Sequence, residues 1–251
     1  MTSSHSFNYP DIYSPDGNGG DLAHNIPWPQ GPIEYLPHPR VISVEHFAGL
    51  DLGQVHDPTA LAILETSEIS IGRSLVTYDW ITIKRRSFRH LERLPLGLDY
   101  PTIVEHVRCL LRRPELCRRT TLVVDATGVG RPVVDLLRRA QLPCRLMPVT
   151  ITAGDRETSD SGTWRVPKRD LITGLLVLLQ REEVDICGHL PESETLVKEL
   201  SAVRIKVSLA GHDTYGAWRE GEHDDLVLAA ALACWRSTKK HPPVIGTRPL
   251  L

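Results

Sequence analysis

Residues 120–130, Thr-Thr-Leu-Val-Val-Asp-Ala-Thr-Gly-Val-Gly, hold the pattern that decides the fold. A short apolar run ends at Asp125, a glycine-rich turn follows, and residues 131–140 then repeat apolar side chains at helical spacing. Residues 144–151 form the next apolar run. The segment therefore predicts a strand, a turn, a helix and a second strand, an order typical of a sheet covered by helices.

Apolar runs on both sides of this segment complete the prediction. Upstream, three extended runs separated by turns with Gly or Pro predict antiparallel strands at 46–52, 59–66 and 74–84. Spacing predicts the remaining elements as helices at 100–113, 167–181, 192–203 and 222–236, an extended piece at 184–187, and a hairpin from 203–209 and 214–218. We expect an α/β fold with an RNase H-like order of elements: a mixed central sheet of three antiparallel strands followed by parallel strands, with helices on both faces.

The composition is that of a globular protein with one main domain: 251 residues, of which 41% are hydrophobic and 24% charged. Residues 1–40 are rich in Pro, Gly, Ser and Asn and lack a sustained apolar period, which favours a flexible N-terminal tail. We expect the folded domain at 41–240 and a short C-terminal tail at 241–251.

Charge, cysteines and hydropathy exclude several classes of protein. The formal net charge of -2 excludes a uniformly basic surface, so phosphate binding has to come from local clusters or from metal ions. The five cysteines include no Cys-x-x-Cys pair, which disfavours a zinc ribbon and a disulfide framework. The sequence has neither a membrane span nor a secretory signal, so we expect an intracellular protein that does not bind membranes.

Acidic residues follow or precede apolar runs at three places. Asp51 ends one run before a glycine-containing turn, Asp125 ends another, and Glu-His-Asp-Asp at 222–225 precedes an almost wholly apolar helix. Each place alone also has a structural explanation, because Asp commonly binds turn amides, caps helices or stabilises a helix N-terminus by its charge. Three acids and a histidine at one helix start exceed what capping requires.

The three acidic places could lie together, because two are strand ends and the third begins a helix that can pack on the same sheet. Two carboxylates about 4 Å apart repel by roughly 4 kcal/mol at an effective dielectric of about 20, so such a cluster needs protons or cations. Mg²⁺ and Mn²⁺ prefer oxygen ligands. The residues by themselves therefore favour a divalent metal site.

Four motifs together resemble the nuclease domain of phage terminase large subunits, which belongs to the RNase H-like superfamily. They are GLDLGQVHDPTA from Gly49, TLVVDATGVG from Thr121, VPKRDL from Val166 and GEHDDLVLAAALA from Gly221. The resemblance covers residues 47–237 in order. It implies a metal-dependent endonuclease that cuts double-stranded DNA by two-metal phosphodiester hydrolysis.

The resemblance also implies roles for single residues. Asp51 and Asp125 match the first two catalytic, metal-binding acids, and Asp224 or Asp225 supplies the third, with His223 as a further candidate ligand. The implied cofactors are two Mg²⁺ or Mn²⁺ ions about 3.5–4 Å apart, one activating water and the other stabilising the departing 3′ oxygen. The sequence does not choose between Asp224 and Asp225.

A complete terminase large subunit also carries an ATPase motor, but no G-x-x-x-x-G-K-[ST] phosphate-binding loop occurs in this sequence. We therefore expect no ATP binding. The resemblance implies a separate ATPase, a small terminase subunit and a portal as partners, in the cytoplasm of a bacterial or phage-infected cell. A separately encoded nuclease half, a prophage remnant and a repurposed domain all fit the sequence.

Two basic clusters are candidates for DNA binding. Lys84, Arg85 and Arg86 belong to the third extended run, and Lys168 and Arg169 precede a predicted helix. Such side chains could steer a phosphate backbone towards the metal ions. The alternative for both clusters is a solvated charged face.

Two other functions fit parts of the sequence. Asp-Leu-Gly at 51–53 and Asp-Ala-Thr-Gly-Val-Gly at 125–130 would suit phosphate-binding turns of an actin-like ATPase or kinase-type fold fragment, but the chain is too short for two such halves. A catalytically silent DNA-packaging or scaffold protein would keep the fold without the metal site. The acid-rich helix start at 222–225 favours the nuclease over both.

Overall fold

The computed structural model describes residues 32–53, 57–127, 130–160, 162–207, 213–216 and 224–239. The chain divides into two compact units. The smaller consists of residues 1–40 and 70–83, and the larger of residues 41–69 and 84–251.

The described strands form one mixed sheet and one separate hairpin. The sheet order is β6-β7-β5-β4-β1-β2-β3-β8, and β9 pairs with β10. The strands are β1 (Ile33–Asp51), β2 (Ala60–Ser74), β3 (Trp80–Arg93), β4 (Thr120–Asp125), β5 (Arg145–Thr152), β6 (Thr158–Asp160), β7 (Thr163–Pro167), β8 (Val184–Ile186), β9 (Arg204–Val207) and β10 (Asp213–Gly216).

The strand register aligns the carboxyl ends of β1, β4 and β5 in the larger unit. In the parallel pair of β1 and β4, His46 lies opposite Thr120 and Leu50 lies opposite Val124. β4 and β5 are also parallel, with Asp125 opposite Val149. Side chains that follow these strands therefore meet at one edge of the sheet.

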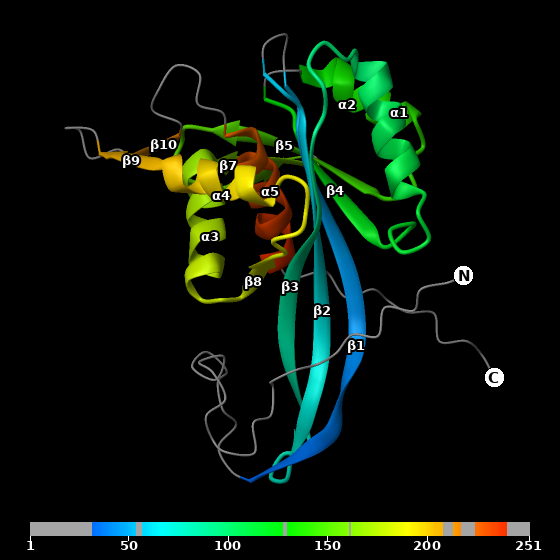
Figure 1. Cartoon of the computed structure of the whole chain (residues 1–251), viewed down its shortest axis with the longest axis vertical. Helices are drawn as coiled ribbons and strands as arrows, with labels where there is room; N and C mark the ends of the chain where they lie inside the picture. The colour runs from blue at the N-terminus through cyan, green and yellow to red at the C-terminus, as the bar shows by residue number, and fades with distance from the viewer. Residues whose placement is uncertain are drawn as a thin grey trace. The chain divides into compact units, whose positions relative to one another are not determined.

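Helices cover both faces of this part of the sheet, as the sequence predicts. Figure 1 shows α1 and α2 on one side of β4 and β5, and α3 and α5 on the other. The helices are α1 (Tyr100–Leu111), α2 (Gly130–Arg139), α3 (Lys168–Gln180), α4 (Ser193–Ala202) and α5 (Asp225–Thr238).

The alternation of side chains along the strands produces two apolar cores, one on each face. Phe47 and Val123 belong to the core that includes α3, α4 and α5. The next residue of β1, Ala48, and the neighbouring Leu122 belong to the core that includes α1 and α2. The predicted fold class is therefore confirmed: a mixed sheet between two helical layers.

A single glycine lets α5 approach the sheet closely. A Cβ atom on Gly49 would lie 1.9 Å from the carbonyl oxygen of Ala229 and 3.0 Å from the amide nitrogen of Ala233. Only a residue without a side chain fits such a contact. Because Gly49 precedes Asp51 by two positions, this packing fixes the start of α5 relative to the carboxyl end of β1.

The smaller unit corrects two predicted boundaries. Residues 33–40 form the start of β1 and are not tail, because this part of the chain finds a partner: the Leu75 amide donates to the Pro32 carbonyl at 3.0 Å. Residues 1–31 of the predicted N-terminal tail and the predicted tail at 241–251 lie outside the described residues.

The predicted third strand at 74–84 is wrong at its start, because a turn separates β2 from β3. The Ser74 hydroxyl accepts hydrogen bonds from the amides of Val76 and Thr77 at 3.3 and 3.2 Å. Tyr78 has a positive φ of 62°, a conformation found in turns and not in strands. β3 therefore begins at Trp80.

The larger unit differs from the prediction in smaller ways. The short strands β6 and β7 were not predicted, and the extended piece at 184–187 is a true sheet strand, β8, which pairs parallel to β3. The predicted hairpin is present as the antiparallel pair β9 and β10. Within the described residues, no helix combines the length and the hydropathy needed to cross a membrane.

Candidate active site

The site begins with two aspartates at the ends of neighbouring parallel strands. Asp51 is the last residue of β1 and Asp125 is the last residue of β4. Because Leu50 lies opposite Val124 in the ladder, the two aspartates are adjacent across it. Both strands are apolar up to this point, so each carboxylate stands where the buried strand gives way to a loop.

The loop after β4 holds the Asp125 carboxylate in place. Its Oδ1 accepts a hydrogen bond from the Thr127 amide at 2.8 Å and another from the Thr127 hydroxyl. The same hydroxyl accepts from the Ile151 amide at 2.7 Å. Burial raises the pKa of Asp125, and the hydrogen bonds from Thr127 act against this rise.

Within the described residues, the Asp51 carboxylate has no hydrogen-bond donor. The Gly53 amide, two positions further along the chain, donates to the Thr59 hydroxyl at 3.1 Å. Residues 54–56, which continue this turn, lie outside the described residues.

Helix α5 brings two further acids to this edge. Asp224 is its N-cap and Asp225 its first residue. Asp224 Oδ2 accepts a hydrogen bond from Nζ of Lys168, the first residue of α3, at 2.6 Å. We call Asp51, Asp125, Asp224 and Asp225 the acid cluster.

The charges of the other three acids act on Asp51. Burial raises the pKa of Asp51 well above its usual value, and the charges of Asp125, Asp225 and Asp224 raise it further. Lys168 acts in the opposite direction. The site is therefore short of positive charge, as expected where carboxylates gather in a partly buried place.

Two residues that sequence reasoning missed complete the network. Glu199 on α4 is only 7% exposed, and its Oε2 accepts a hydrogen bond from the Val227 amide in the first turn of α5 at 3.1 Å. Arg93, the last residue of β3, contacts Glu199 and also Asp225, the latter at 3.4 Å. Burial raises the pKa of Glu199 to about 7, against the effect of Arg93.

The acid cluster thus has a cation on each side. Lys168 is bound to Asp224, and Arg93 to Asp225. With these contacts made, no three His, Cys, Asp or Glu side chains of the described residues are arranged closely enough to form a ready metal-binding group. His223, the further candidate ligand, lies outside the described residues.

The structure corrects the first basic cluster. Arg86 is buried, its Nε donates to the Ser237 hydroxyl at 3.1 Å, and its Nη1 pairs with Glu183 at 3.3 Å. Arg86 therefore joins β3 to the end of α5 and is not free to bind DNA. Its position two residues before the buried Phe88 places both side chains on the same face of the strand.

The rest of that cluster lies away from the acids. Lys84 is exposed, and Arg85 pairs with Asp185 at 3.5 Å. Nine residues of β3 separate Lys84 from Arg93, which corresponds to about 30 Å at ~3.3 Å per residue. These side chains do not line the acid cluster.

In the second basic cluster, one residue contacts the acid cluster and the other does not. Lys168 reaches the acid cluster, as described above. Arg169 forms ion pairs with two other carboxylates: its Nη1 lies 3.0 Å from Asp155, and its Nε lies 3.3 Å from Asp170. Lys168 is therefore the basic residue of this pair that belongs to the site.

Comparisons with known proteins place the fold. No protein-family model matches the chain, and no curated protein matches its sequence. The solved large terminase nuclease from the thermophilic phage G20c is similar in structure, with a TM-score of 0.50, 19% identity, and coverage of 84% of this chain and 93% of that one.

Two further structures are similar to a comparable extent. The G20c nuclease with bound magnesium has a TM-score of 0.50 and 22% identity, and the match covers 82% of this chain and 91% of that chain. The large terminase nuclease domain of Thermus phage P74-26 has a TM-score of 0.49 and 20% identity, with 81% and 88% covered. The chain therefore has the RNase H-like fold of terminase nuclease domains.

Proposed function

We propose that the chain is a metal-dependent DNA endonuclease whose acid cluster holds two divalent ions, Mg²⁺ or Mn²⁺, and hydrolyses phosphodiester bonds. The observation that carries this proposal is the meeting of Asp51, Asp125 and the first acids of α5 at one edge of the sheet. Coupled, partly buried acids of this kind are typical of sites that bind cations for catalysis.

The donor set fits a hard divalent cation. It offers only carboxylate oxygens, which Mg²⁺ and Mn²⁺ prefer over nitrogen or sulfur. A cation between the acids would also remove the repulsion that raises the pKa of Asp51. The G20c nuclease, which has this fold, has been solved with bound magnesium and with bound cobalt.

The bound ions would supply Lewis acidity for attack by water on phosphorus and for departure of the 3′ oxygen. The chain's own residues prepare the site. Thr127 fixes the orientation of Asp125, and Arg93 bridges Asp225 to Glu199. Lys168 can leave Asp224 for a phosphate oxygen, since its side chain is 31% exposed.

The proposed substrate is double-stranded DNA, as the resemblance of the sequence motifs to terminase nuclease domains implies. The sequence has no G-x-x-x-x-G-K-[ST] loop. DNA translocation would therefore need an ATPase supplied from elsewhere, with a small terminase subunit and a portal as the further proposed partners. Lys168 is the basic residue that we retain for contact with DNA near the acids; Lys84, Arg85 and Arg169 lie against other groups or at a distance.

The first experiment is cleavage of supercoiled plasmid with Mn²⁺ or Mg²⁺, with EDTA and the variants Asp51→Ala and Asp125→Ala as controls. We expect nicking or linearisation that requires both the metal and these two acids. Folded protein that leaves duplex, single-stranded and branched DNA intact would contradict the proposal and favour a silent packaging or scaffold protein. ATP hydrolysis by the purified chain would favour the ATPase-type alternative.

A parallel experiment identifies the third acid. Asp224→Asn and Asp225→Asn are compared for cleavage and for melting temperature. We expect Asp225→Asn to lower the melting temperature, because Asp225 is buried and bound to Arg93, whereas Asp224→Asn leaves it nearly unchanged. The variant that loses cleavage while remaining fully stable marks the metal ligand.

A further inference from the structure

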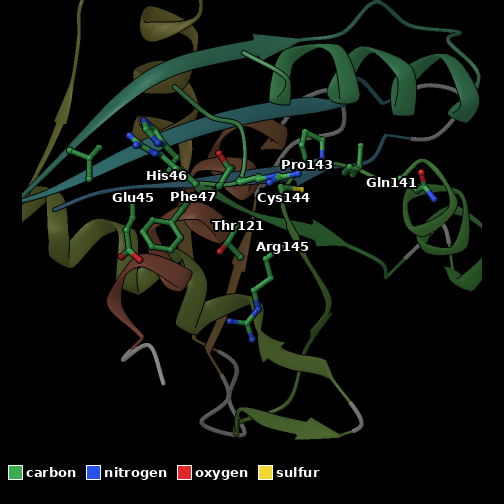
Figure 2. Close-up of a pocket in the computed structure, with 13 residues that line it drawn as sticks. Glu45, His46, Phe47, Thr121, Gln141, Pro143, Cys144 and Arg145 are labelled. Carbon is green, nitrogen blue, oxygen red and sulfur yellow. The ribbon is translucent and has the colours of Figure 1, made fainter. Parts of the chain in front are cut away.

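A cavity of about 790 Å³ lies at the opposite, amino-terminal edge of the same parallel strands. Figure 2 shows residues from β1, from the start of β4 and from the start of β5 around it. The strand register brings these elements together, since His46 lies opposite Thr120 and Thr121 lies opposite Arg145. The cavity is thus built by the sheet itself and is separate from the acid cluster.

The cavity lining is positively charged. Arg118, Arg119 and Arg145 line it and are exposed, and Glu45 is its one acidic residue among the described lining. In the part of the chain that the structure describes, none of these three arginines has a carboxylate partner. Three guanidinium groups without a carboxylate partner give the cavity a positive potential that attracts a negatively charged ligand.

A fourth arginine adds to the positive charge from α5. Arg236 is buried behind the cavity wall, with its Cζ 5.8 Å from the centre of the Phe47 ring. Burial lowers the pKa of Arg236, the charge of Arg145 lowers it further, and the charge of Glu45 acts in the opposite direction. Arg145 and Arg236 are therefore close enough to repel, and an anion in the cavity would relieve that repulsion.

The cavity also contains a buried histidine with one uncommitted nitrogen. The His46 side chain is 6% exposed, and its Nε2 lies 3.6 Å from Glu65. Glu65 is fixed in turn by Arg89 at 2.8 Å. The His46 contact is the largest cause that lowers the pKa of Glu65, to about 2.

Within the described residues, the second ring nitrogen of His46, a residue that lines the cavity, has no partner. This nitrogen, Nδ1, is buried. With Nε2–H directed at Glu65, Nδ1 of a neutral ring accepts a hydrogen bond. A buried polar atom without a partner destabilises the folded protein, so a hydrogen-bond donor that reaches Nδ1 would bind favourably. A nucleotide carries both an anionic phosphate and N–H donors on its base.

We infer that this cavity, which we call the arginine pocket (His46, Arg118, Arg119 and Arg145), binds a nucleotide unit of the nucleic acid outside the acid cluster. The inference extends the proposed function and rests on it for the choice of nucleic acid over an acidic protein segment. Five residues of β4 separate Thr120 from Asp125, which is about 17 Å at ~3.3 Å per residue. About five nucleotides of one duplex strand, at ~3.4 Å each, cover that distance.

The remaining groups of the pocket are compatible with an anionic ligand. Burial raises the pKa of the Cys144 thiol to about 11, so Cys144 faces the ligand as a neutral thiol. Thr120 directs its hydroxyl away, to the Leu116 carbonyl at 2.8 Å. The negative charge of Glu45 remains smaller than the combined charge of the three arginines.

The test measures DNA binding without cleavage. A fluorescent duplex and a fluorescent single strand are titrated with protein in EDTA across a salt series. The proteins are the wild type, the pocket variant Arg118→Gln/Arg119→Gln/Arg145→Gln, and the control variant Arg108→Gln/Arg181→Gln/Lys198→Gln, which loses the same number of positive charges. We expect the pocket variant to bind roughly tenfold or more weakly and its salt slope to fall by about 2 to 3, at ~0.9 for each lost duplex phosphate contact. The control should stay within about twofold of the wild type.

A second variant probes the histidine alone. His46→Gln keeps an N–H donor for Glu65 but lacks an atom equivalent to Nδ1, and we expect severalfold weaker binding with an unchanged salt slope. Circular dichroism and thermal melting establish that each variant folds. Equal losses in the pocket variant and the control would overturn the inference, and so would no loss in the pocket variant.

Two comparisons separate this inference from the proposed function. If the wild type binds DNA through the pocket but never cleaves it, the nuclease proposal fails and the pocket stands. If it cleaves DNA while the pocket variant binds normally, the pocket inference fails alone. A glutamate-rich peptide that binds more tightly than DNA, and only when the arginines are present, would overturn the nucleotide assignment in favour of an acidic protein partner.

Discussion

At the carboxyl ends of β1 and β4 the sheet presents Asp51 and Asp125, whereas the amino-terminal edge of the same strands opens on Arg119 and Arg145. Between the two edges the strands are apolar and buried, as at Val123. The two charge clusters are therefore held apart by the core and cannot neutralise each other by contact. The acidic edge has only Lys168 and Arg93 as cationic contacts of its acids, and the opposite edge carries three exposed arginines with Glu45 as the one acid among the described lining residues.

The comparison shows how one short strand can serve two chemical purposes. In the proposed function, metal-dependent chemistry is assigned to the edge where carboxylates are coupled and have raised pKa values. In the further inference, binding of the phosphate backbone is assigned to the edge that carries the three arginines. Variants at the two edges should therefore have separable effects on DNA cleavage and on DNA binding.

The largest effect is expected at the acidic edge. Asp51→Asn should reduce plasmid cleavage by roughly a hundredfold to a thousandfold, the range for loss of one electrostatic group in an active site. Its affinity for DNA in EDTA should stay at or above that of the wild type, because a repelling charge is lost. The pocket variant should show the reverse: it should bind DNA weakly, and saturating DNA should restore its cleavage. Parallel losses of both properties in both variants would break the comparison.

Glu199 should make stability depend on pH. Its carboxyl has a pKa of about 7 in the folded protein, against an ordinary value of 4.5, so the folded state retains a proton that the unfolded state releases. Its contribution is fully present below pH 4.5 and is lost as the pH rises through 7, by roughly 3 kcal/mol in total. Urea unfolding in EDTA should show this loss in the wild type and not in Glu199→Gln. A constant difference between the two proteins across that range would contradict the assignment.

The close contact between β1 and α5 gives a prediction for stability. Gly49→Ala should destabilise the protein by about 1–3 kcal/mol, because its Cβ would overlap the Ala229 carbonyl. It should also reduce cleavage, since α5 carries Asp224 and Asp225. Gly174→Ala on α3 is the matched control: a Cβ there meets nothing within 4 Å, and the change should stabilise the helix by up to about 1 kcal/mol. Similar melting temperatures for the two variants would exclude this packing role.

The smallest effect concerns the cation at the acid cluster. Lys168→Met should lower cleavage by about tenfold, the lower end for residues that support metal ligands, while Lys168→Arg should keep part of the activity. Metal affinity should rise in Lys168→Met, because the ammonium group no longer competes for Asp224. Unchanged metal affinity together with unchanged cleavage would show that Lys168 has no part in the site.

The sequence predicts the parts of the molecule that depend on local patterns. The positions of Asp51 and Asp125 at strand ends follow from the apolar runs that precede them, and the position of the α5 acids at a helix start follows from the apolar run after them; their role as metal ligands stays a prediction. The helical layers were predicted from spacing alone. The turn at Ser74 was missed, since the hydroxyl hydrogen bonds and the positive φ of Tyr78 that interrupt the strand leave no break in the apolar pattern.

Contacts between distant segments were beyond prediction, although weak signals for two of them exist. Glu199 lies three positions after Leu196 on the buried face of α4, so a charged residue on an apolar face could have indicated a partner. Arg86 alternates with the buried Phe88, which argues for burial rather than for DNA contact. Nothing in the sequence indicates that Arg93 reaches Asp225, because that contact depends on how β3 and α5 pack.

The most direct test of the central claim is a count of bound divalent ions at the acidic edge. Mn²⁺ binding, followed by the electron paramagnetic resonance of the free ion, is measured for the wild type, for Asp51→Asn/Asp125→Asn and for the pocket variant, without DNA. We predict that the wild type and the pocket variant bind Mn²⁺ equally and that the double aspartate variant loses this binding while remaining folded. Equal Mn²⁺ binding by all three proteins would contradict a metal site at the acid cluster.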